Sequence, residues 1–225
     1  SIDHEMGEVH IVGGHHPDWP FEHYEQLVKD IHAAFPNVNI KGFTASEIDY
    51  FHRRWKIEPE ESLARLKDAG LRSMPGGGAE VFSPRVHKIL LPGKANGDRW
   101  ADIHKIAHRM GIPTNCTLLY GHIETFEERV DHLIRLRNIQ DETGGFTAFI
   151  CWTFQNDGSA ALKAQTVGSS EYLRTLAISR LYLDNFENIQ SSWVTQGMKV
   201  GELSLRFGAN DMGSTMLGEN VVSSA

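Results

Sequence analysis

Short apolar runs alternate with amphipathic stretches along the whole chain of 225 residues. Each run has the length of a buried strand, and the runs lie at 8–14, 38–43, 71–74, 114–120, 147–154 and 189–195. Apolar residues at helical spacing occupy the intervals between them. These intervals predict helices over 21–35, 46–54, 59–70, 99–110, 125–139, 171–186 and 200–207.

A strand followed by a helix, repeated along the chain, is typical of a parallel sheet, because parallel strands need a long crossover connection. An open doubly wound sheet and a closed barrel both fit this order. The barrel is favoured, since polar or glycine-rich motifs follow nearly every strand instead of gathering at one switch point. We therefore expect an α/β fold, a TIM-like (β/α) barrel, with residues 1–225 in a single domain.

The chain carries 22 basic and 29 acidic side chains, a net charge of −7. This balance argues against a general nucleic-acid binder, whose affinity comes from lysine and arginine at phosphates. No run of about 18 apolar residues is present, and the first residues lack the pattern of a signal peptide. We expect a cytoplasmic protein with no nucleic-acid and no membrane partner.

The two cysteines, Cys116 and Cys151, are too few for a disulfide framework or a four-cysteine zinc site. They are also too few for an iron–sulfur cluster, which usually needs three or four thiolates. Both lie inside predicted strands, so we expect them to be buried small apolar residues.

Catalytic groups of parallel barrels lie at the carboxyl ends of the strands. The glycines Gly76–Gly78 follow one strand and leave backbone N–H groups free for an anion or a carboxylate, although a wide strand-to-helix turn would use the same residues. Glu80 and Glu124 suit ribose hydroxyls or an ammonium group. Glu124 also has an alternative role, as an acid favoured by the dipole at the start of a helix.

Twelve histidines raise the question of a metal site. His15 and His16 follow a strand, but adjacent residues of an extended chain point to opposite faces. His104 and His108 are four residues apart on a predicted outer helix, where we expect solvated side chains. His122, between a strand end and a helix start, is the better candidate for a site histidine.

Two aromatic segments, 152–155 and 191–197, combine bulky side chains with Thr and Gln. Such residues suit the walls of a pocket for a partly aromatic, hydroxylated ligand. Packing in the barrel core is the alternative interpretation.

Taken together, the ordered motifs resemble radical S-adenosylmethionine (SAM) enzymes of the menaquinone futalosine pathway, and more distantly their deazaflavin-synthase relatives. The segments that carry the resemblance are HIVGGHHPDWPFE (10–22), FTASEI (43–48), AGLRSMPGGGAE (69–80), TLLYGHIET (117–125), IQDETGGFTAFICWTFQ (139–155), SWVTQGMKVG (192–201) and FGANDMGSTM (207–216). The resemblance implies a radical SAM-type barrel with SAM and a 4Fe–4S cluster as cofactors. It also implies a nucleoside-derived small-molecule substrate and an electron donor such as flavodoxin or ferredoxin.

The resemblance also implies roles for particular residues. Gly13 and Gly14 match the glycine pair whose backbone binds the methionyl amino group of SAM. The other implied cofactor contacts are Glu80, Gly121 and His122. The implied substrate contacts are Gly77, Gly78, Thr153, Gln155, Trp193, Thr195, Gln196, Asn210 and Asp211. No metal ligand and no catalytic residue is implied within this chain.

Two sister reactions fit these motifs. Segments 75–82, 103–115 and 119–125 resemble the enzyme that adds the 5′-deoxyadenosyl radical to an enolpyruvyl-benzoate. Segments 151–155, 171–185, 192–197 and 208–216 resemble the enzyme that abstracts a ribose hydrogen from dehypoxanthine futalosine and cyclises the radical onto the benzoate ring. The C-terminal motifs discriminate better, so the cyclase is favoured.

The chain departs from the family at its start, because the C-x3-C-x2-C motif is absent and the first βα unit is missing. It opens without Met at what should be the second strand, so we expect a fragment or a degenerate copy. Three functions are considered: the radical enzyme or a piece of it, a cluster-less barrel that binds nucleosides or a partner chain, and a metal-dependent hydrolase using His15, His16 and His122.

The strand at 8–14 would form an unpaired parallel edge with apolar side chains, and such edges promote aggregation. We therefore predict poor solubility of the isolated chain. Light scattering tests this, and a monodisperse monomer would contradict it.

Overall fold

The computed structural model describes residues 6–155 and 167–214. All strand pairs in this part of the chain are parallel, within a two-stranded sheet β1–β2 and a three-stranded sheet β3–β4–β5. The strands are β1 (Glu8–Ile11), β2 (Asn39–Gly42), β3 (Thr114–Tyr120), β4 (Phe146–Thr153) and β5 (Asn188–Gln190).

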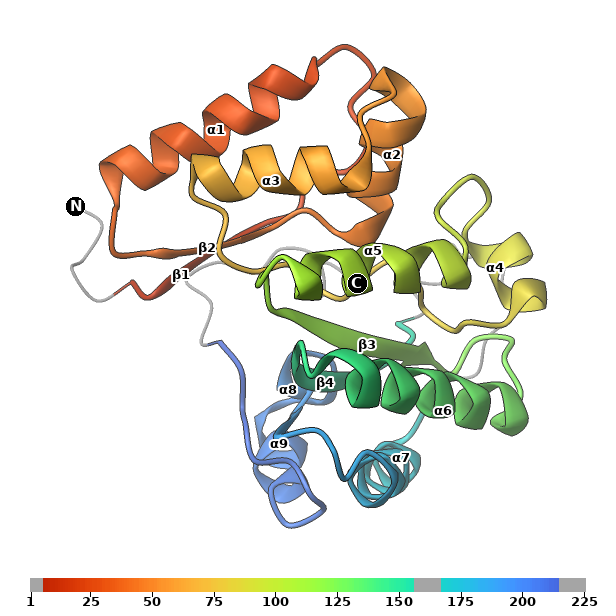
Figure 1. Cartoon of the computed structure of the whole chain (residues 1–225). Coiled ribbons are helices and arrows are strands. Elements are labelled where there is room, and N and C mark those ends of the chain that lie inside the picture. Colours follow the sequence, from red (N-terminus) through yellow and green to blue (C-terminus); the bar gives the residue numbers. More distant parts are fainter. Residues whose placement is uncertain (1–5, 156–166, 215–225) are drawn as a thin grey trace.

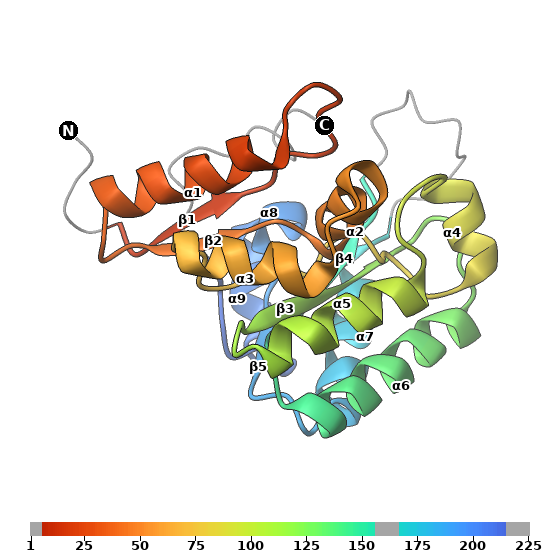
Figure 2. The same ribbon diagram turned by 45° about the horizontal axis from the view of Figure 1, so that its top comes forward.

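Helices α1, α3, α5, α6 and α7 succeed one another in chain order from the top to the bottom of Figure 1, next to the strands (Figures 1 and 2). The helices are α1 (Phe21–Ala34), α2 (Ala45–Trp55), α3 (Pro59–Ala69), α4 (Pro84–Leu90), α5 (Gly97–Arg109), α6 (Phe126–Thr143), α7 (Ser169–Tyr182), α8 (Trp193–Gln196) and α9 (Met198–Ser204). None of the helices described is both long and apolar enough to span a bilayer.

The strand expected at 71–74 is reduced to isolated bridges, but it still joins the two sheets. Ser73 pairs with Lys41 of β2, and Met74 pairs with Thr114 of β3, both in parallel. A last bridge sets Asp211 beside Gln190. The two sheets and these bridges thus form the expected parallel α/β arrangement, and we call this row of strands the wall. The absence of a first βα unit stays a prediction.

The apolar core lies between this wall and the helices. On β3, Cys116, Leu118 and Tyr120 are fully buried, and the Tyr120 ring lies under Arg129 of α6. The alternate residues Asn115 and Thr117 face the other side of the sheet. Thus one face of β3 packs against helices, and the other face carries Asn115 and Thr117 among apolar neighbours such as Ile150 of β4.

The segment expected as a strand at 189–195 changes conformation halfway. Pairing ends at Gln190, and α8 begins at Trp193. The N–H of Ser191 bonds the carbonyl of Asp211 (2.7 Å), and that of Ser192 bonds the hydroxyl of Tyr172 (2.8 Å). These contacts turn the chain out of the sheet and override the strand preference of the β-branched residues in α8.

His104 and His108 are not solvated, contrary to expectation, because the side of α5 that carries them packs onto β3. Thr143 donates its hydroxyl to the Ile139 carbonyl (2.8 Å), so it accepts from His108 Nδ1 (2.7 Å). His108 Nε2 then accepts from the Thr114 hydroxyl (2.9 Å), which accepts from His104 Nδ1 (2.8 Å). In this arrangement His108 accepts at Nε2 and is therefore neutral, whereas His104 donates from Nδ1 and its Nε2 is buried without a partner among the described residues.

Acid should therefore destabilise the fold. Burial lowers the pKa of His104 well below its usual value, that of His108 to about 4 and that of His132 to about 3. Below pH 6.5 the unfolded chain binds protons that the folded chain does not, so each such histidine removes about 1.4 kcal/mol of stability per pH unit. We expect denaturant midpoints to fall between pH 6.5 and pH 4.

A matched pair of variants checks this source. His132→Gln retains a donor for the Thr117 carbonyl, which His132 Nε2 contacts at 2.9 Å, and should flatten the pH dependence. His23→Gln, at an exposed position, should leave the slope unchanged. Equal slopes for both variants would contradict the assignment.

Candidate functional site

The loops that follow the strands meet in sequence around one rim of the wall. Gly13 N–H, after β1, donates to Glu47 of α2 (3.0 Å). In the next loop, Leu119 of β3 donates its N–H to the Glu80 carbonyl (3.1 Å). On the far side, Gln196 of α8 donates to Thr153 Oγ1 of β4 (2.7 Å). The residues expected at separate strand ends are thus brought to one rim.

The first rim loop contains Gly13 and Gly14. Gly14 has φ +65° and open space where a Cβ would lie. His15 stacks on Tyr50 with ring centroids 4.5 Å apart, and its Nε2 lies 3.1 Å from the Ser46 carbonyl oxygen. The side chain of His15 is therefore used to hold the loop, while the glycine backbone stays open.

In the glycine run, the three residues have different environments. Gly76 donates to Asn115 Oδ1 (2.5 Å) and accepts from Thr117 Oγ1 (3.1 Å), so it packs directly onto β3. Gly77 has only Thr44 within 4 Å of a Cβ position, whereas a Cβ on Gly78 would lie 2.6 Å from Ser46 Oγ. The close-turn interpretation holds for Gly76, and space for a ligand exists beside Gly77.

Glu80 ends the glycine loop in a left-handed conformation, with φ +52°. Such backbone is sparsely populated by residues other than glycine and is common at functional positions. Burial raises the pKa of this carboxyl group, and the charges of Lys94 and His122 partly oppose the rise. Glu80 therefore holds a proton more readily than a solvent-exposed glutamate does.

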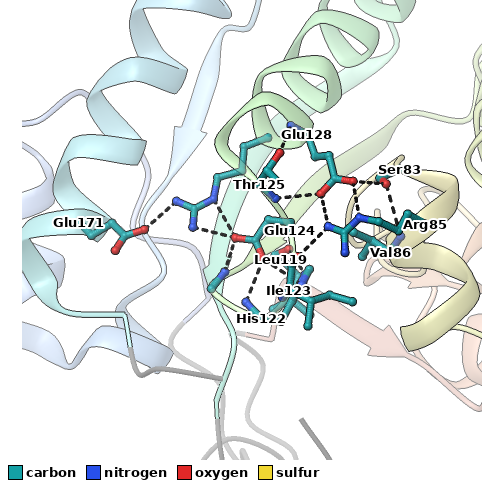
Figure 3. A network of polar contacts seen from close by, with 12 residues as sticks. Ser83, Arg85, Val86, Leu119, His122, Ile123, Glu124, Thr125, Glu128 and Glu171 are labelled. Atoms are coloured by element: carbon teal, nitrogen blue, oxygen red, sulfur yellow. Dashed lines mark hydrogen bonds and ion pairs between the residues drawn. The ribbon is translucent and has the colours of Figure 1, made fainter. Parts of the chain in front are cut away.

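The loop after β3 is organised by the carboxylate of Glu124 (Figure 3). It accepts the N–H of Gly121 (2.7 Å), the N–H of His122 (2.9 Å) and the guanidinium of Arg129 (2.7 Å). Burial by itself would raise the pKa of Glu124, but the His122 side chain and the N–H groups of Gly121 and His122 lower it to about 2. Glu124 is therefore an ionised structural anchor.

The His122 ring is also engaged inside this loop. Its Nε2 lies 2.9 Å from the Leu119 carbonyl, and its Nδ1 lies 2.7 Å from the Ile123 N–H and 2.9 Å from Glu124. Its side chain is fully buried. A cofactor contact at this position would come from the backbone of His122 and not from its ring.

A second set of ion-paired and hydrogen-bonded side chains lies beside Glu124 and joins α4 to α6 (Figure 3). Glu128 accepts from Ser83 Oγ (2.5 Å) and from Arg85 (2.6 Å), and it closes a capping box with Thr125. Arg85 also donates to the Ile123 carbonyl (2.7 Å). This group holds α4, a helix that the sequence analysis missed although Ser83 followed by Pro84 is a helix-start signal.

At the end of β4 the expected substrate residues form one cluster. The hydroxyl of Thr153 accepts from Gln155 (2.9 Å) and from Gln196 (2.7 Å). Thr195 Oγ1 bonds Ser192 (2.7 Å) within the same turn. Trp193, at the start of α8, lies against Gly201, where a Cβ would be 2.7 Å from that of Trp193.

Asn210 and Asp211 lie apart from this cluster. The Asn210 amide bonds Arg180 (2.7 Å) and the Glu187 carbonyl (3.1 Å), next to the start of β5 and away from the rim. Asp211 lies beside Gln190, and its carboxylate accepts from the Gly213 N–H (2.7 Å). Asn210 therefore has a structural set of contacts in place of the expected substrate contact.

The thiols do not fit an iron–sulfur cluster. Cys116 and Cys151 are both fully buried, and burial raises the pKa of Cys116 well above its usual value and that of Cys151 to about 12. In residues 6–155 and 167–214, no group of three His, Cys, Asp or Glu side chains could hold a metal ion. His15, His16 and His122 all bond the backbone, which does not support the hydrolase hypothesis.

Three residues of the rim have roles that sequence reasoning did not assign. Glu47 closes a capping box with Thr44, and the Thr-x-x-Glu spacing is the signal that could have revealed it. Arg129 lies one turn into α6, and its link to the rim comes from Glu124. Lys94, in the loop after α4, acts electrostatically on both Glu80 and His15, and no sequence pattern marks it.

Comparison with protein families agrees with this arrangement. Residues 2–136 match the family model described as the Radical SAM superfamily. Residues 143–225 match the CofH/MqnC C-terminal region. The first model spans more than half of the chain. The chain therefore belongs to the radical SAM superfamily.

Curated relatives are similar over nearly the whole chain. Aminodeoxyfutalosine synthase of Thermus thermophilus is 46% identical over 96% of this chain and 59% of its own length. Cyclic dehypoxanthine futalosine synthase of Streptomyces coelicolor is 46% identical over 98% and 56%. A 5-amino-6-(D-ribitylamino)uracil–L-tyrosine 4-hydroxyphenyl transferase of Methanopyrus kandleri is 40% identical over 95% and 59%. The chain thus spans less than two thirds of these relatives.

Among solved structures, methylornithine synthase superposes with a TM-score of 0.69. The match covers 94% of this chain and 59% of the other, at 15% identity. At that identity the likeness concerns the fold alone, and it agrees with the parallel α/β wall.

The glycine loop offers a direct test of the rim geometry. Gly78→Ala should lower the free energy of unfolding by about 1–3 kcal/mol, because a Cβ would meet Ser46 Oγ while φ stays at +99°. Gly77→Ala, with open space at its Cβ, should change it by less than about 0.5 kcal/mol. Urea denaturation measures both, and equal losses would contradict the geometry.

Proposed function

We propose that the rim binds SAM together with a futalosine-derived nucleoside, and that the chain acts in a radical SAM enzyme of menaquinone biosynthesis. Cyclisation of dehypoxanthine futalosine is the favoured reaction. The observation that carries the proposal is the meeting of the Gly13–Gly14, Gly77–Glu80, Gly121–His122 and Thr153–Gln155 segments at one rim. The two relatives at 46% identity, an aminodeoxyfutalosine synthase and a cyclic dehypoxanthine futalosine synthase, support this proposal.

The residues present fit the SAM part of this proposal. Gly14 and Gly77 leave open backbone, and Ser46 Oγ is a buried polar atom without a hydrogen-bond partner within the described residues. An unpaired buried hydroxyl is costly unless a ligand or water satisfies it. When bound, SAM supplies the 5′-deoxyadenosyl group for the radical chemistry of this family.

Different segments of the rim contact different parts of the ligands. The backbone of Gly13 and Gly14 contacts the methionyl end, and the backbone of Gly121 and His122 contacts the adenine end. Glu80, whose pKa is raised, can hold a proton beside the bound nucleoside. Gly77 leaves room for the nucleoside on the same side, and the Gly78 backbone lies next to Ser46.

The substrate side rests on the Thr153 cluster. Trp152 of β4 pairs with Leu119 of β3, so the two side chains lie on the same face of the sheet. The Nε1 of Trp152 is buried without a partner within the described residues. Gln155 and Gln196 bond Thr153, and with Thr195 and Trp193 they form the proposed contact surface for the substrate. Asp211 stays in the proposal as a neighbour of Gln190, and Asn210 is left out.

The cluster required by the family does not fit the residues of this chain, as the two buried thiols show. We therefore derive no step through it. An electron donor such as flavodoxin or ferredoxin would have to reduce such a cluster. The two buried thiols of this chain cannot hold one. Binding of cofactor and substrate is the part of the function that these residues support.

The second candidate is the sister reaction, in which the 5′-deoxyadenosyl group is added to an enolpyruvyl-benzoate. The relative named aminodeoxyfutalosine synthase and the cyclase relative are equally similar to this chain, at 46% identity, and this supports the sister reaction as a candidate. A cluster-less barrel that only binds nucleosides is the third, and the poor fit of the thiols supports it.

Calorimetric titration separates the first two candidates. The chain should bind SAM, and it should bind dehypoxanthine futalosine more tightly than the enolpyruvyl-benzoate. The reverse order would favour the sister reaction. Absence of binding by SAM and by both substrates would overturn the proposal.

Thr153→Val should weaken dehypoxanthine futalosine binding about tenfold, since it removes the hydroxyl that orients Gln155 and Gln196. Thr147→Val is the matched control on the same strand, because Thr147 bonds the Thr114 carbonyl at the opposite end of β4. The same titration measures both variants. Equal affinities would remove the Thr153 cluster from the substrate site.

A further inference from the structure

Two glutamates share an arrangement at the rim. Glu47 and Glu124 each have a buried carboxylate, 2% and 1% exposed, that accepts the backbone N–H of a rim glycine. Glu47 Oε1 accepts from Gly13 (3.0 Å), and Glu124 Oε1 accepts from Gly121 (2.7 Å). Both glycines lie in the two loops that the proposed function assigns to SAM.

We propose that Glu47 and Glu124 are positioning residues, which hold the backbone of these two loops in the ligand-binding conformation before the ligand arrives. This inference rests on the proposed function for the identity of the ligand. The contacts that carry it are present in the chain itself.

Glu47 uses both carboxylate oxygens. While Oε1 accepts from Gly13, Oε2 accepts the Thr44 N–H (2.8 Å) and the Thr44 hydroxyl (2.9 Å). The carboxylate thus ties the loop after β1 to the first turn of α2. Since the Gly13 N–H points to Glu47, the orientation of that peptide group is set, and open backbone remains at Gly14.

Glu124 also uses both oxygens, on the second loop. Oε1 accepts from Gly121 and Arg129, and Oε2 accepts from the His122 N–H (2.9 Å). Gly121 has φ +89°, and Arg129 continues to Glu171 of α7 (2.7 Å). The guanidinium also lies over the Tyr120 ring, 4.5 Å from its centroid, so the anchor is packed as well as charged.

Glutamine cannot replace either glutamate in this role. A carboxylate accepts at two oxygens, whereas an amide has one oxygen and an NH2 donor. In Glu47→Gln or Glu124→Gln, one backbone N–H would therefore face another donor. A loop released in this way must be ordered by the ligand, and that ordering lowers affinity.

Glu128→Gln is the matched control. Glu128 is a glutamate of the same helix start, with a carboxylate that bonds Thr125, Ser83 and Arg85 but no rim glycine. Its replacement should lower stability without altering the two loops. Arg129→Lys is the milder variant on the Glu124 side, because it keeps the positive charge but removes one of the two guanidinium contacts to Glu124 Oε1. The carboxylate that accepts the Gly121 N–H is then held less firmly.

The experiment measures amide hydrogen exchange by NMR in the ligand-free chain and SAM affinity by calorimetry. For Glu47→Gln we expect about tenfold faster exchange at Gly13, and for Glu124→Gln the same at Gly121 and His122. Both variants should bind SAM about tenfold more weakly, whereas Glu128→Gln should bind as the wild type does. Exchange identical to wild type in both variants, or unchanged SAM affinity, would overturn the inference.

Failure of the proposed function gives a different result. In that case the wild-type chain binds no SAM, and the exchange rates at Gly13, Gly121 and His122 still decide whether the glutamates hold the loops. If Glu124→Gln does not fold, Arg129→Lys decides for that loop, since faster exchange at Gly121 supports the inference and unchanged exchange contradicts it.

Discussion

The parallel direction of the strands is the constraint on which the rest of the structure depends. Because every described pair runs the same way, the chain leaves β1, β2, β3 and β4 at the same edge of the wall. The loops that follow must then lie side by side. Their mutual contacts, from Gly13 to Glu47 and from Leu119 to Glu80, follow from that direction.

Carboxylates of opposite environments lie within this rim. At Glu124, burial is outweighed by the His122 side chain and by the N–H groups of Gly121 and His122, which lower its pKa to about 2. Burial dominates at Glu80 and raises its pKa. Hydrogen bonds to the charged form and desolvation have opposite effects on a carboxylate. One acid is therefore suited to fix backbone, and the other to carry a proton.

Much of the fold was predictable because local patterns and tertiary packing agree. The helix expected over 21–35 is found as Phe21–Ala34, and α6 begins at Phe126, next to the start expected at 125. The segment at 189–195 was predicted wrongly, since contacts from Tyr172 and Asp211 act across the chain and leave no local pattern. His104 and His108 were misplaced for a related reason, because a helix pattern does not show that its polar residues meet threonines of β3 and α6.

The sequence by itself determined the order of strands and helices and the family, through apolar periodicity and ordered motifs that depend on near neighbours. It also determined that two cysteines cannot serve a cluster. Tertiary structure alone decided which polar groups are open to a ligand. Gly76, His122 and Asn210 form hydrogen bonds within the chain, whereas Gly77 and Ser46 Oγ stay open. The physical reason is that a hydrogen-bond partner is chosen by distance in space, and the partners of Gly76 and Asn210 lie far away in sequence.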